Sequence, residues 1–226
     1  MPWTRDQMAL RAVKEMQENW YINIGIGIPT LINNCALPEG VMLQNENGML
    51  GMGPFPYEGD EDPDIISAGK QTITEIDRTS YFDEADSFAM IRGGHLDMTF
   101  IGGMQVSERG DLASWIVPGG LVKGPGGSMD LVAGAKRVCV LMEHVTKDGK
   151  PRLLRNCTYP LTGVGVVDLL ITNLGVFSFD GGFVCEEMAD GVEIDEIRSK
   201  SDAEIRNRST QISKSHVIRE ALRCRP

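Results

Sequence analysis

The sequence predicts an α/β domain, with a layered, mixed but mostly parallel sheet that is flanked by helices. Short apolar segments alternate along the chain with segments of helical periodicity. A length of 226 residues is enough for one such domain with its own core. Glycine is frequent, at 26 residues, and shows no collagen-like period, which favours many tight turns over a plain helical bundle.

The first elements are a helix and two strands. Thr4 can cap a helix that begins at Arg5, and Gln7 occupies the capping-box position three residues later. Residues 21–27 predict a strand that runs into a tight turn, after which Pro29 suits the first position of a helix. A second short strand is expected at residues 41–44.

The middle and the end of the chain continue this alternation. Residues 45–53 are dense in glycine, and the acidic, proline-containing segment 55–64 predicts an exposed loop. A helix is expected over residues 83–92. The remaining predicted strands are 97–101, 137–142, 169–172, 176–179 and 183–185. A hairpin turn at residues 180–182 joins the last two, so the sheet should have an antiparallel edge late in the chain.

We expect a single domain over residues 1–196 and a basic C-terminal tail over residues 197–226. The tail holds eight Lys and Arg residues against three acids, so it carries +5 and the rest of the chain −15, for a total of −10. A solvated tail that is partly helical or frayed is the simpler interpretation. The alternative is a basic arm that docks on an acidic partner surface.

Composition excludes several functional classes. The net charge of −10 argues against nucleic-acid binding. No run approaches the ~18 to 20 apolar residues that a membrane span needs. The N-terminus lacks the apolar region of a secretory signal, so we expect a cytoplasmic protein. The five cysteines form no C-x-x-C pair and the three histidines no H-x-x-x-H pair, so we expect no metal site.

Three glycine-rich segments could form a ligand site, and the first is residues 25–30. This segment follows a strand, and Glu46 lies where a dinucleotide-binding domain has its ribose-binding acid. However, Thr30 occupies the third glycine position of the fingerprint, and Pro29 has no amide N–H to offer a pyrophosphate. A nicotinamide site is therefore disfavoured.

The second segment, residues 44–54, places Glu46 at the end of a predicted strand, directly before several glycines. Ligands gather at strand ends in open α/β sheets. Taken alone, this segment could equally be an Asn-Gly turn with a solvated carboxylate.

The third segment, residues 119–130, has five glycines before a predicted helix start. Such a backbone lets amide groups approach an anion or a developing oxyanion closely. The segment lacks the Gly-Lys-Ser/Thr ending of a Walker A loop. Two glycine-rich turns, one of them beside a carboxylate, favour a site more than either does alone.

Residues 44–54 read Gln-x-Glu-Asn-Gly-x-Leu-Gly-x-Gly-Pro, which resembles the catalytic-glutamate segment of the class I CoA-transferases, in their β subunit or C-terminal half. The resemblance covers roughly residues 5–191, and most resembles the enzymes that use succinate and a 3-oxo acid. Relatives that use 3-oxoadipate or short-chain fatty acids are the alternatives. Further matching segments are 23–30, 68–70, 87–95, 110–113, 122–124, 126–127, 129–131, 142–144 and 160–163.

The resemblance implies covalent catalysis in which Glu46 forms a glutamyl-CoA thioester. It implies no metal and no permanently bound cofactor, with the CoA thioester as a substrate. Glu46 must be ionised and reachable, which suits an exposed strand end better than a buried one. Asn47 and Gly48 would shape the turn that presents Glu46. The residues expected to meet the thioester oxygen or CoA are Gly124, Gly126 and Gly127, with Lys70 and Lys123 as weaker candidates.

The resemblance also implies a partner, the α subunit, in a heterodimer or heterotetramer in which the partner makes the main CoA contacts. The small-molecule ligands would be an acyl-CoA and a carboxylic acid. An acyl-CoA hydrolase and a non-catalytic scaffolding subunit are the alternative functions.

Some positions depart from the family pattern. Asn45 stands where Ser is usual, and a lysine is absent at Gly120, which bears on CoA affinity. The other departures are Ser114, Pro125 and Ser128. Among the remaining charged residues, we expect His144 to make a structural hydrogen bond, with a Glu143–His144 pair that supports the site as the alternative. We expect Arg92 to act as a helix-terminus charge, with contact to the site as its alternative.

Overall fold

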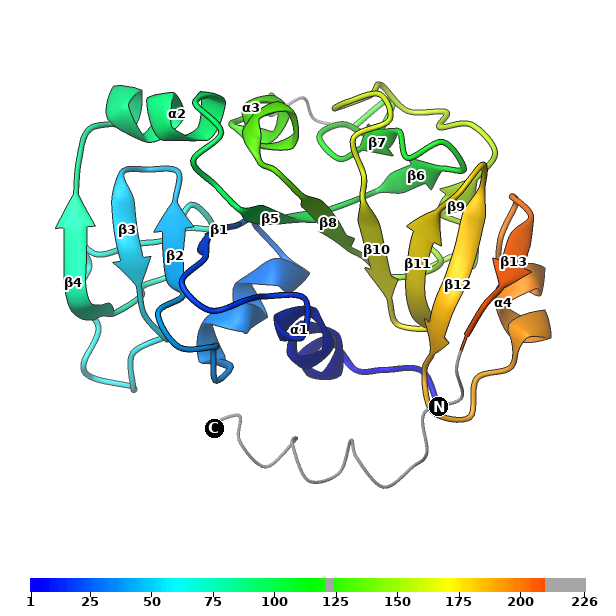
Figure 1. Ribbon diagram of the computed structural model, residues 1–226, viewed down its shortest axis with the longest axis horizontal. Helices are drawn as coiled ribbons and strands as arrows, with labels where there is room; N and C mark the ends of the chain where they lie inside the picture. Colours follow the sequence, from blue (N-terminus) through cyan, green and yellow to red (C-terminus); the bar gives the residue numbers. More distant parts are fainter. Residues whose placement is uncertain (121–123, 210–226) are drawn as a thin grey trace.

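The computed structural model describes residues 1–120 and 124–209, and a ten-stranded sheet dominates it (Figure 1). The strand order is β13-β12-β11-β10-β8-β5-β1-β2-β3-β4. The five central strands are mutually parallel, as in an α/β fold. They are β1 (Tyr21–Ile24), β2 (Met42–Asn45), β5 (Met98–Gly102), β8 (Val138–Leu141) and β10 (Leu169–Thr172).

Antiparallel pairs flank the central strands on both sides. On one side β11 (Gly175–Phe179) and β12 (Phe183–Met188) form the expected late hairpin, and β13 (Ile205–Asn207) pairs parallel with β12. On the other side β3 (Met49–Met52) and β4 (Glu75–Tyr81) form an antiparallel edge that the sequence analysis missed. The glycines of residues 45–53 hid β3, because glycine is a weak strand former.

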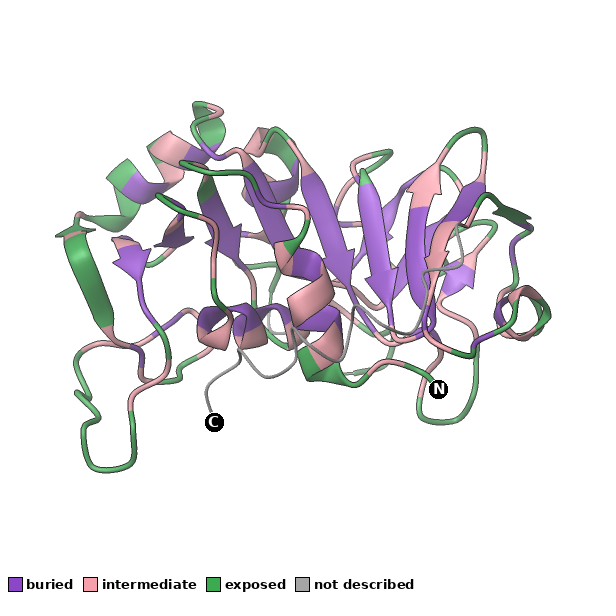
Figure 2. Ribbon diagram, turned by 60° about the horizontal axis from the view of Figure 1, so that its bottom comes forward, coloured by how far each residue is buried: buried purple, intermediate pink, exposed green. Residues whose placement is uncertain are grey.

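Helices cover both faces of the sheet. Helix α1 (Arg5–Val13) and the 3₁₀ helix η1 (Ile28–Asn34) pack on one face of the sheet. On that face they share a buried cluster with Cys139 and Leu141 of β8. Helix α3 (Ser128–Gly134) packs on the opposite face and lies against α2 (Glu84–Arg92). The central strands are therefore buried on both sides, whereas β4 is exposed (Figure 2).

Local signals correctly placed the first helix. The Thr4 hydroxyl accepts a hydrogen bond from the Gln7 amide at 3.2 Å, and the Gln7 side chain accepts one from the Thr4 amide at 2.8 Å. This is the predicted capping box. Pro29 lies in the first turn of η1, as expected, although that helix has 3₁₀ rather than α geometry.

A smaller sheet of three strands extends the core on the α3 side. It consists of β7 (Leu112–Ala113), β6 (Gln105–Ser107) and β9 (Leu153–Leu154), in that order. Its residues Val106, Leu112 and Leu153 are fully buried in the same cluster as the outer strands of the main sheet. These very short strands were not predicted.

The expected boundary after residue 196 falls within helix α4 (Ile194–Ser199). Ile197 and Ile205 are buried in the main core, and β13 extends the main sheet. The domain thus continues at least to residue 209. The rest of the expected tail, residues 210–226, lies outside the described residues. None of the described helices is long and apolar enough to cross a membrane.

Candidate active site

Glu46 lies in the turn that joins β2 to β3, directly after the carboxyl end of a parallel strand. The Gly48 amide donates to the Asn45 carbonyl at 3.1 Å and closes this turn. Because β2 pairs in parallel with β1, the turn opens at the edge of the sheet where α/β folds bind ligands. The structure therefore puts the carboxylate at a strand end, as the sequence predicted.

Gly48 holds this turn against the segment between β4 and α2. Its φ is +114°, and a Cβ at this position would lie 2.0 Å from the Phe82 carbonyl oxygen. The Phe82 amide in turn donates to the Gly48 carbonyl at 3.0 Å. Only glycine fits both the backbone conformation and the close approach. Asn47, the residue between Glu46 and Gly48, is exposed at the tip.

The two glycine-rich turns meet at Glu46. Gly127 lies against the Glu46 carboxylate, and its amide favours the charged form. A Cβ at Gly127 would lie 2.8 Å from Glu46 Oε2 and 2.9 Å from Phe88 Cζ, so carboxylate and ring both press on this glycine. The structure thus brings together the carboxylate and one of the three glycines expected to provide backbone donors.

Glu46 is half-buried, so it is less open than the sequence analysis expected. Burial raises the pKa of its carboxyl above the ordinary value, and the negative charge of Glu84 raises it further. The Gly127 amide acts in the opposite direction and lowers the pKa, and Asp130 adds another upward contribution. The site therefore holds a carboxylate that is partly desolvated and consequently more reactive towards an electrophile than one in water.

The structure explains the asparagine that precedes Glu46. The Asn45 side chain donates to the Ile66 carbonyl at 3.1 Å and accepts from the Ala68 amide at 3.1 Å. Asn45 is 2% exposed, so both hydrogen bonds are shielded from water. Asn45 thereby attaches the segment around residues 66–68 to the turn that carries Glu46.

Lys70 lies at the tip of that attached segment. Its amide donates to the Ser67 carbonyl at 2.9 Å, and its φ is +63°. Its side chain lines an open hollow of about 410 Å³. The other lining residues are Phe55, Pro56, Glu61, Gln71 and Thr72. Lys70 is therefore an exposed cation on a segment that Asn45 ties to the Glu46 turn.

The remaining glycine candidates do not contact Glu46 in this structure. Gly124 and Gly126 are exposed, and a Cβ at either would meet no atom of the described residues within 4 Å. The departures Pro125 and Ser128 form a local turn, in which the Ser128 hydroxyl donates to the Pro125 carbonyl at 2.6 Å. Lys123 lies outside the described residues.

The other two departures lie away from the Glu46 contacts. The Ser114 amide donates to the Thr162 hydroxyl at 3.0 Å, and the two hydroxyls are 2.7 Å apart. The Gly120 amide donates to the Val117 carbonyl at 2.9 Å and closes a turn there. Nothing else in the structure explains the absence of a lysine at position 120.

A buried polar chain supports the strand that ends at Glu46. Gln44 donates to the Ser87 hydroxyl at 2.8 Å and accepts from the Asn23 amide at 2.6 Å. The Thr99 hydroxyl donates to the Asn23 side-chain oxygen at 3.1 Å. These four residues, from β1, β2, β5 and α2, are at most 1% exposed. A fully satisfied buried network of this kind fixes the positions of its strands.

Sequence reasoning missed the residues of α2 and α3 that surround Glu46. Phe88, Glu84 and Asp130 act on it through packing or charge, and Arg92 is paired with Asp130. Their spacing in the sequence carries no signal of this arrangement, because it arises only when α2 and α3 pack together beyond the end of β2.

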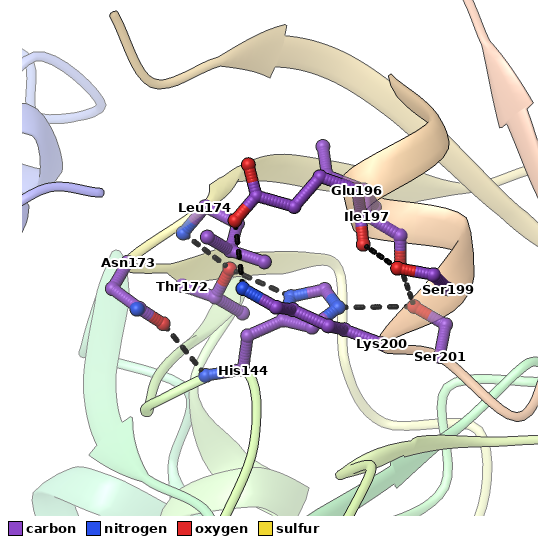
Figure 3. Close-up of polar contacts among 9 residues, drawn as sticks. All are labelled: His144, Thr172, Asn173, Leu174, Glu196, Ile197, Ser199, Lys200 and Ser201. Carbon is purple, nitrogen blue, oxygen red and sulfur yellow. Dashed lines mark hydrogen bonds and ion pairs between the residues drawn. The ribbon is translucent and has the colours of Figure 1, made fainter. Parts of the chain in front are cut away.

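His144 forms a different kind of polar cluster, three residues after the end of β8 (Figure 3). Its Nδ1 is 3.0 Å from the Thr172 hydroxyl, and its Nε2 is 3.0 Å from the Ser201 hydroxyl. The Ser201 hydroxyl donates to the Ile197 carbonyl at 2.8 Å, so it accepts from Nε2–H. The other ring nitrogen, Nδ1, is hydrogen-bonded to the Thr172 hydroxyl.

Burial lowers the pKa of His144 to about 4, and the nearby Lys200 charge contributes in the same direction. The two ring nitrogens connect β10 to the segment directly after α4, which confirms the expected structural hydrogen bonding. The neighbouring Glu143 does not pair with His144 and bonds to Arg5 at 3.0 Å instead.

Within residues 1–120 and 124–209, no group of three or more His, Cys, Asp or Glu side chains could hold a metal ion. Among the described cysteines, Cys139, Cys157 and Cys185 are unlinked thiols.

Comparison with known proteins agrees with this geometry. Residues 6–200 match the family model described as coenzyme A transferase. The chain is 55% identical over 207 residues to one subunit of the probable succinyl-CoA:3-ketoacid coenzyme A transferase of Bacillus subtilis (strain 168), covering 90% of this chain and 95% of that protein. It is 50% identical over 201 residues to the corresponding subunit of the succinyl-CoA:3-ketoacid coenzyme A transferase of Helicobacter pylori (strain ATCC 700392 / 26695), covering 88% and 97%.

A solved structure shares the fold. The acyl-CoA transferase YdiF apoenzyme from Escherichia coli O157:H7 superposes with a TM-score of 0.72 at 21% identity. The match covers 91% of this chain but only 42% of the YdiF chain, so this chain spans less than half the length of that relative. The family model and the two bacterial relatives together show that the chain belongs to the coenzyme A transferase family.

Proposed function

We propose that this chain is the glutamate-bearing subunit of a transferase that moves CoA between succinate and a 3-oxo acid such as acetoacetate. The observation that carries the proposal is Glu46 at the end of β2, with the Gly127 amide on its carboxylate. The bacterial relatives named as succinyl-CoA:3-ketoacid transferase subunits support this pair of acids.

The first half of the reaction is an acyl transfer to Glu46. The ionised carboxylate attacks the thioester carbonyl of the acyl-CoA, and the C–S bond breaks to release CoA thiolate. The product on the enzyme is a mixed anhydride between Glu46 and the acyl group. The thiolate then attacks the Glu46 carbonyl, which releases the first carboxylic acid as its anion and leaves a glutamyl-CoA thioester.

The second half runs the same steps in reverse. The carboxylate of the acceptor acid attacks the glutamyl-CoA carbonyl, and CoA thiolate leaves again. Attack of the thiolate on the acceptor's carbonyl forms the new acyl-CoA and restores the Glu46 carboxylate. No proton, metal or oxidant is consumed, so protein groups and CoA itself suffice for the chemistry.

The Gly127 amide suits both charge states of Glu46. It stabilises the carboxylate before reaction, and it is free to bind a developing oxyanion once acylation removes that charge. One such donor contributes about 3 kcal/mol, or roughly a hundredfold in rate. Because the pKa of Glu46 is raised, activity should decline on the acid side at a higher pH than for an ordinary glutamate.

The CoA thioester is a substrate in this proposal, with no permanently bound cofactor. Gly124 and Gly126 offer unobstructed backbone for its approach, and the exposed Lys70 offers a cation for a carboxylate or phosphate. Lys123 remains a weaker candidate for the same role. The net charge of −10 is unfavourable for a polyanionic ligand, so much of the CoA binding should come from another chain.

That other chain is the α subunit, in a heterodimer that we expect to assemble into a heterotetramer. The names of the two bacterial relatives, each designated as one subunit of its enzyme, support the need for a partner. We expect the complex to work in the cytoplasm, where widely spaced cysteines stay reduced.

The decisive experiment traps the intermediate. The chain is co-expressed with its α subunit and incubated with succinyl-CoA, and peptide mass spectrometry then maps the CoA adduct. We expect the adduct on Glu46 in the native chain and none in E46Q. An unmodified Glu46, or full activity in E46Q, would contradict the mechanism.

The same preparation separates the alternatives. Steady release of free CoA without any acceptor acid would indicate a hydrolase. Undiminished transferase activity of the complex with E46Q would indicate a scaffolding role for this chain. A panel of acceptor acids, including acetoacetate and 3-oxoadipate, then decides the acid pair.

A further inference from the structure

An ion pair joins α2 to α3 in the first turn after Gly127. Arg92, the last residue of α2, donates from Nε to Asp130 Oδ1 at 2.7 Å. The Arg92 guanidinium carbon also lies 5.4 Å from the centroid of the Phe88 ring. A single arginine thus contacts the helix that follows Gly127 and the ring that packs on Gly127.

Two acids and one amide act on the charge of Glu46 within the described part of the chain. Glu84 in the first turn of α2 and Asp130 in the first turn of α3 disfavour the ionised carboxylate, and the Gly127 amide favours it. Arg92 pairs with Asp130 and leaves Glu84 unopposed in this cluster. One of the two opposing acids is therefore neutralised and the other is not.

We propose that Arg92 and Asp130 are a positioning pair for Glu46: Arg92 neutralises the Asp130 carboxylate beside the nucleophile and ties α2 to α3, so that the Gly127 amide and the Phe88 ring stay against the Glu46 carboxylate. This inference rests on the proposed role of Glu46 as the nucleophile. It assigns a role in reactivity to an arginine that sequence analysis took for a helix-terminus charge.

The side chains of Arg92 and Asp130 are too exposed for their ion pair to contribute much to the stability of the fold. The Arg92 side chain is 65% exposed and that of Asp130 is 29% exposed. Ion pairs at such exposure contribute little to folding stability. Substitutions here should therefore leave the fold intact and change the ionisation and placement of Glu46.

The proposal predicts effects of opposite sign. R92Q leaves the Asp130 charge unopposed, so Glu46 should hold its proton to higher pH. D130N removes one of the two acids that disfavour the Glu46 charge, so Glu46 should lose its proton at lower pH. The double variant R92Q/D130N removes both charges and should return towards the native profile.

The test measures the rate of CoA-adduct formation on Glu46 against pH, with succinyl-CoA as the probe and the chain in complex with its α subunit. On the acid side we expect R92Q to react about two- to fivefold more slowly than the native protein and D130N to react faster. At high pH, where Glu46 is fully ionised in every variant, the charge effect disappears, and any rate difference that remains measures the loss of the tie between α2 and α3. R92K keeps the positive charge, so its rate of adduct formation on the acid side should stay close to that of the native protein.

Arg5 provides a matched control. It bonds through Nε to Glu143 at 3.0 Å, with side-chain exposures of 62% and 32%, but it lies away from the Glu46 contacts. R5Q should leave the pH profile unchanged. Equal profiles for the native chain, R92Q and D130N, or shifts of R92Q and D130N in the same direction, would overturn the proposal.

A titration of Glu46 keeps this test independent of the proposed chemistry. ¹³C NMR of glutamate-labelled full-length chain, with E46Q to assign the signal, follows the carboxyl group directly. If the native complex formed no adduct, the proposed function would fail, and the titration would still decide this inference. Titration midpoints ordered D130N, native, R92Q from low to high pH would support the positioning pair, and any other order would overturn it.

Discussion

Two parallel strands of the same sheet end in ionisable residues with opposite properties. Glu46 follows β2 and is half-buried, with a raised pKa and a backbone amide that favours its charge. His144 lies beyond β8 and is fully buried, with a pKa near 4 and partners at both ring nitrogens. Burial shifts both groups towards their neutral forms.

The neighbours decide what each group can do. The His144 ring is saturated by Thr172 and Ser201, so it has no free nitrogen for a ligand. The Glu46 carboxylate receives the Gly127 amide and lies on a turn that opens at the edge of the sheet. The strand end therefore only places an ionisable group at the edge of the sheet. The residues packed around the group decide whether it can react with a ligand or serves as a structural hydrogen-bonding group.

The largest effect should come from removing the Glu46 carboxylate. We expect E46Q to lower transferase activity by about 10³-fold or more, because the amide cannot form the anhydride. Its unfolding temperature should not fall, since the substitution removes a charge that burial disfavours. E84Q is the matched carboxylate control and should remain active. Activity of E46Q within tenfold of native would show that Glu46 resembles His144 in being structural.

A methyl group at Gly127 should have the next largest effect. The φ of Gly127 is −78°, so alanine fits the backbone, but its Cβ would lie 2.8 Å from Glu46 Oε2. We expect G127A to lower kcat about a hundredfold by displacing the carboxylate from the amide. G69A, whose Cβ would meet its nearest atom at 3.5 Å, serves as the control. Equal kinetics for the two variants would refute the contact.

Replacing His144 should change how the free energy of unfolding depends on pH in the acid range, and it should leave catalysis unchanged. Its pKa of about 4 lies below the ordinary 6.5, so unfolding takes up a proton between these values. The contribution of His144 to stability is complete above pH 6.5 and declines by about 3 kcal/mol as the pH falls to 4. Urea unfolding of native protein and H144Q across this range should show a steeper loss for the native protein. Parallel pH curves for the two proteins would count against this.

The smallest effect should follow from N45S, which introduces the residue that is usual in the family. Serine cannot span both the Ile66 carbonyl and the Ala68 amide, so one of two buried hydrogen bonds is lost. We expect the free energy of unfolding to fall by about 1 kcal/mol, with activity within threefold of native. Urea unfolding and steady-state assays would measure both. A loss of activity well beyond threefold, with the free energy of unfolding lowered by only about 1 kcal/mol, would mean that Asn45 acts on Glu46 directly.

Much of the framework was predictable from local patterns. The capping box of Thr4 and Gln7, the strand at residues 21–24 and the hairpin at residues 180–182 all lie where the sequence indicated. The Glu46 turn was also located from its own residues. The missed elements, β3 and the strands of the small sheet, are short or rich in glycine, and their pairing depends on distant segments.

By itself, the sequence determined the fold class, the family resemblance and the choice of Glu46, because each depends on neighbouring residues and on periodicity along one element. Only the tertiary structure decided that Gly127 lies against Glu46, that the Phe88 ring lies against Gly127 with Arg92 over that ring, and that both nitrogens of His144 have hydrogen-bond partners. The physical reason is that desolvation and charge act through space, and here they join segments that lie far apart along the chain.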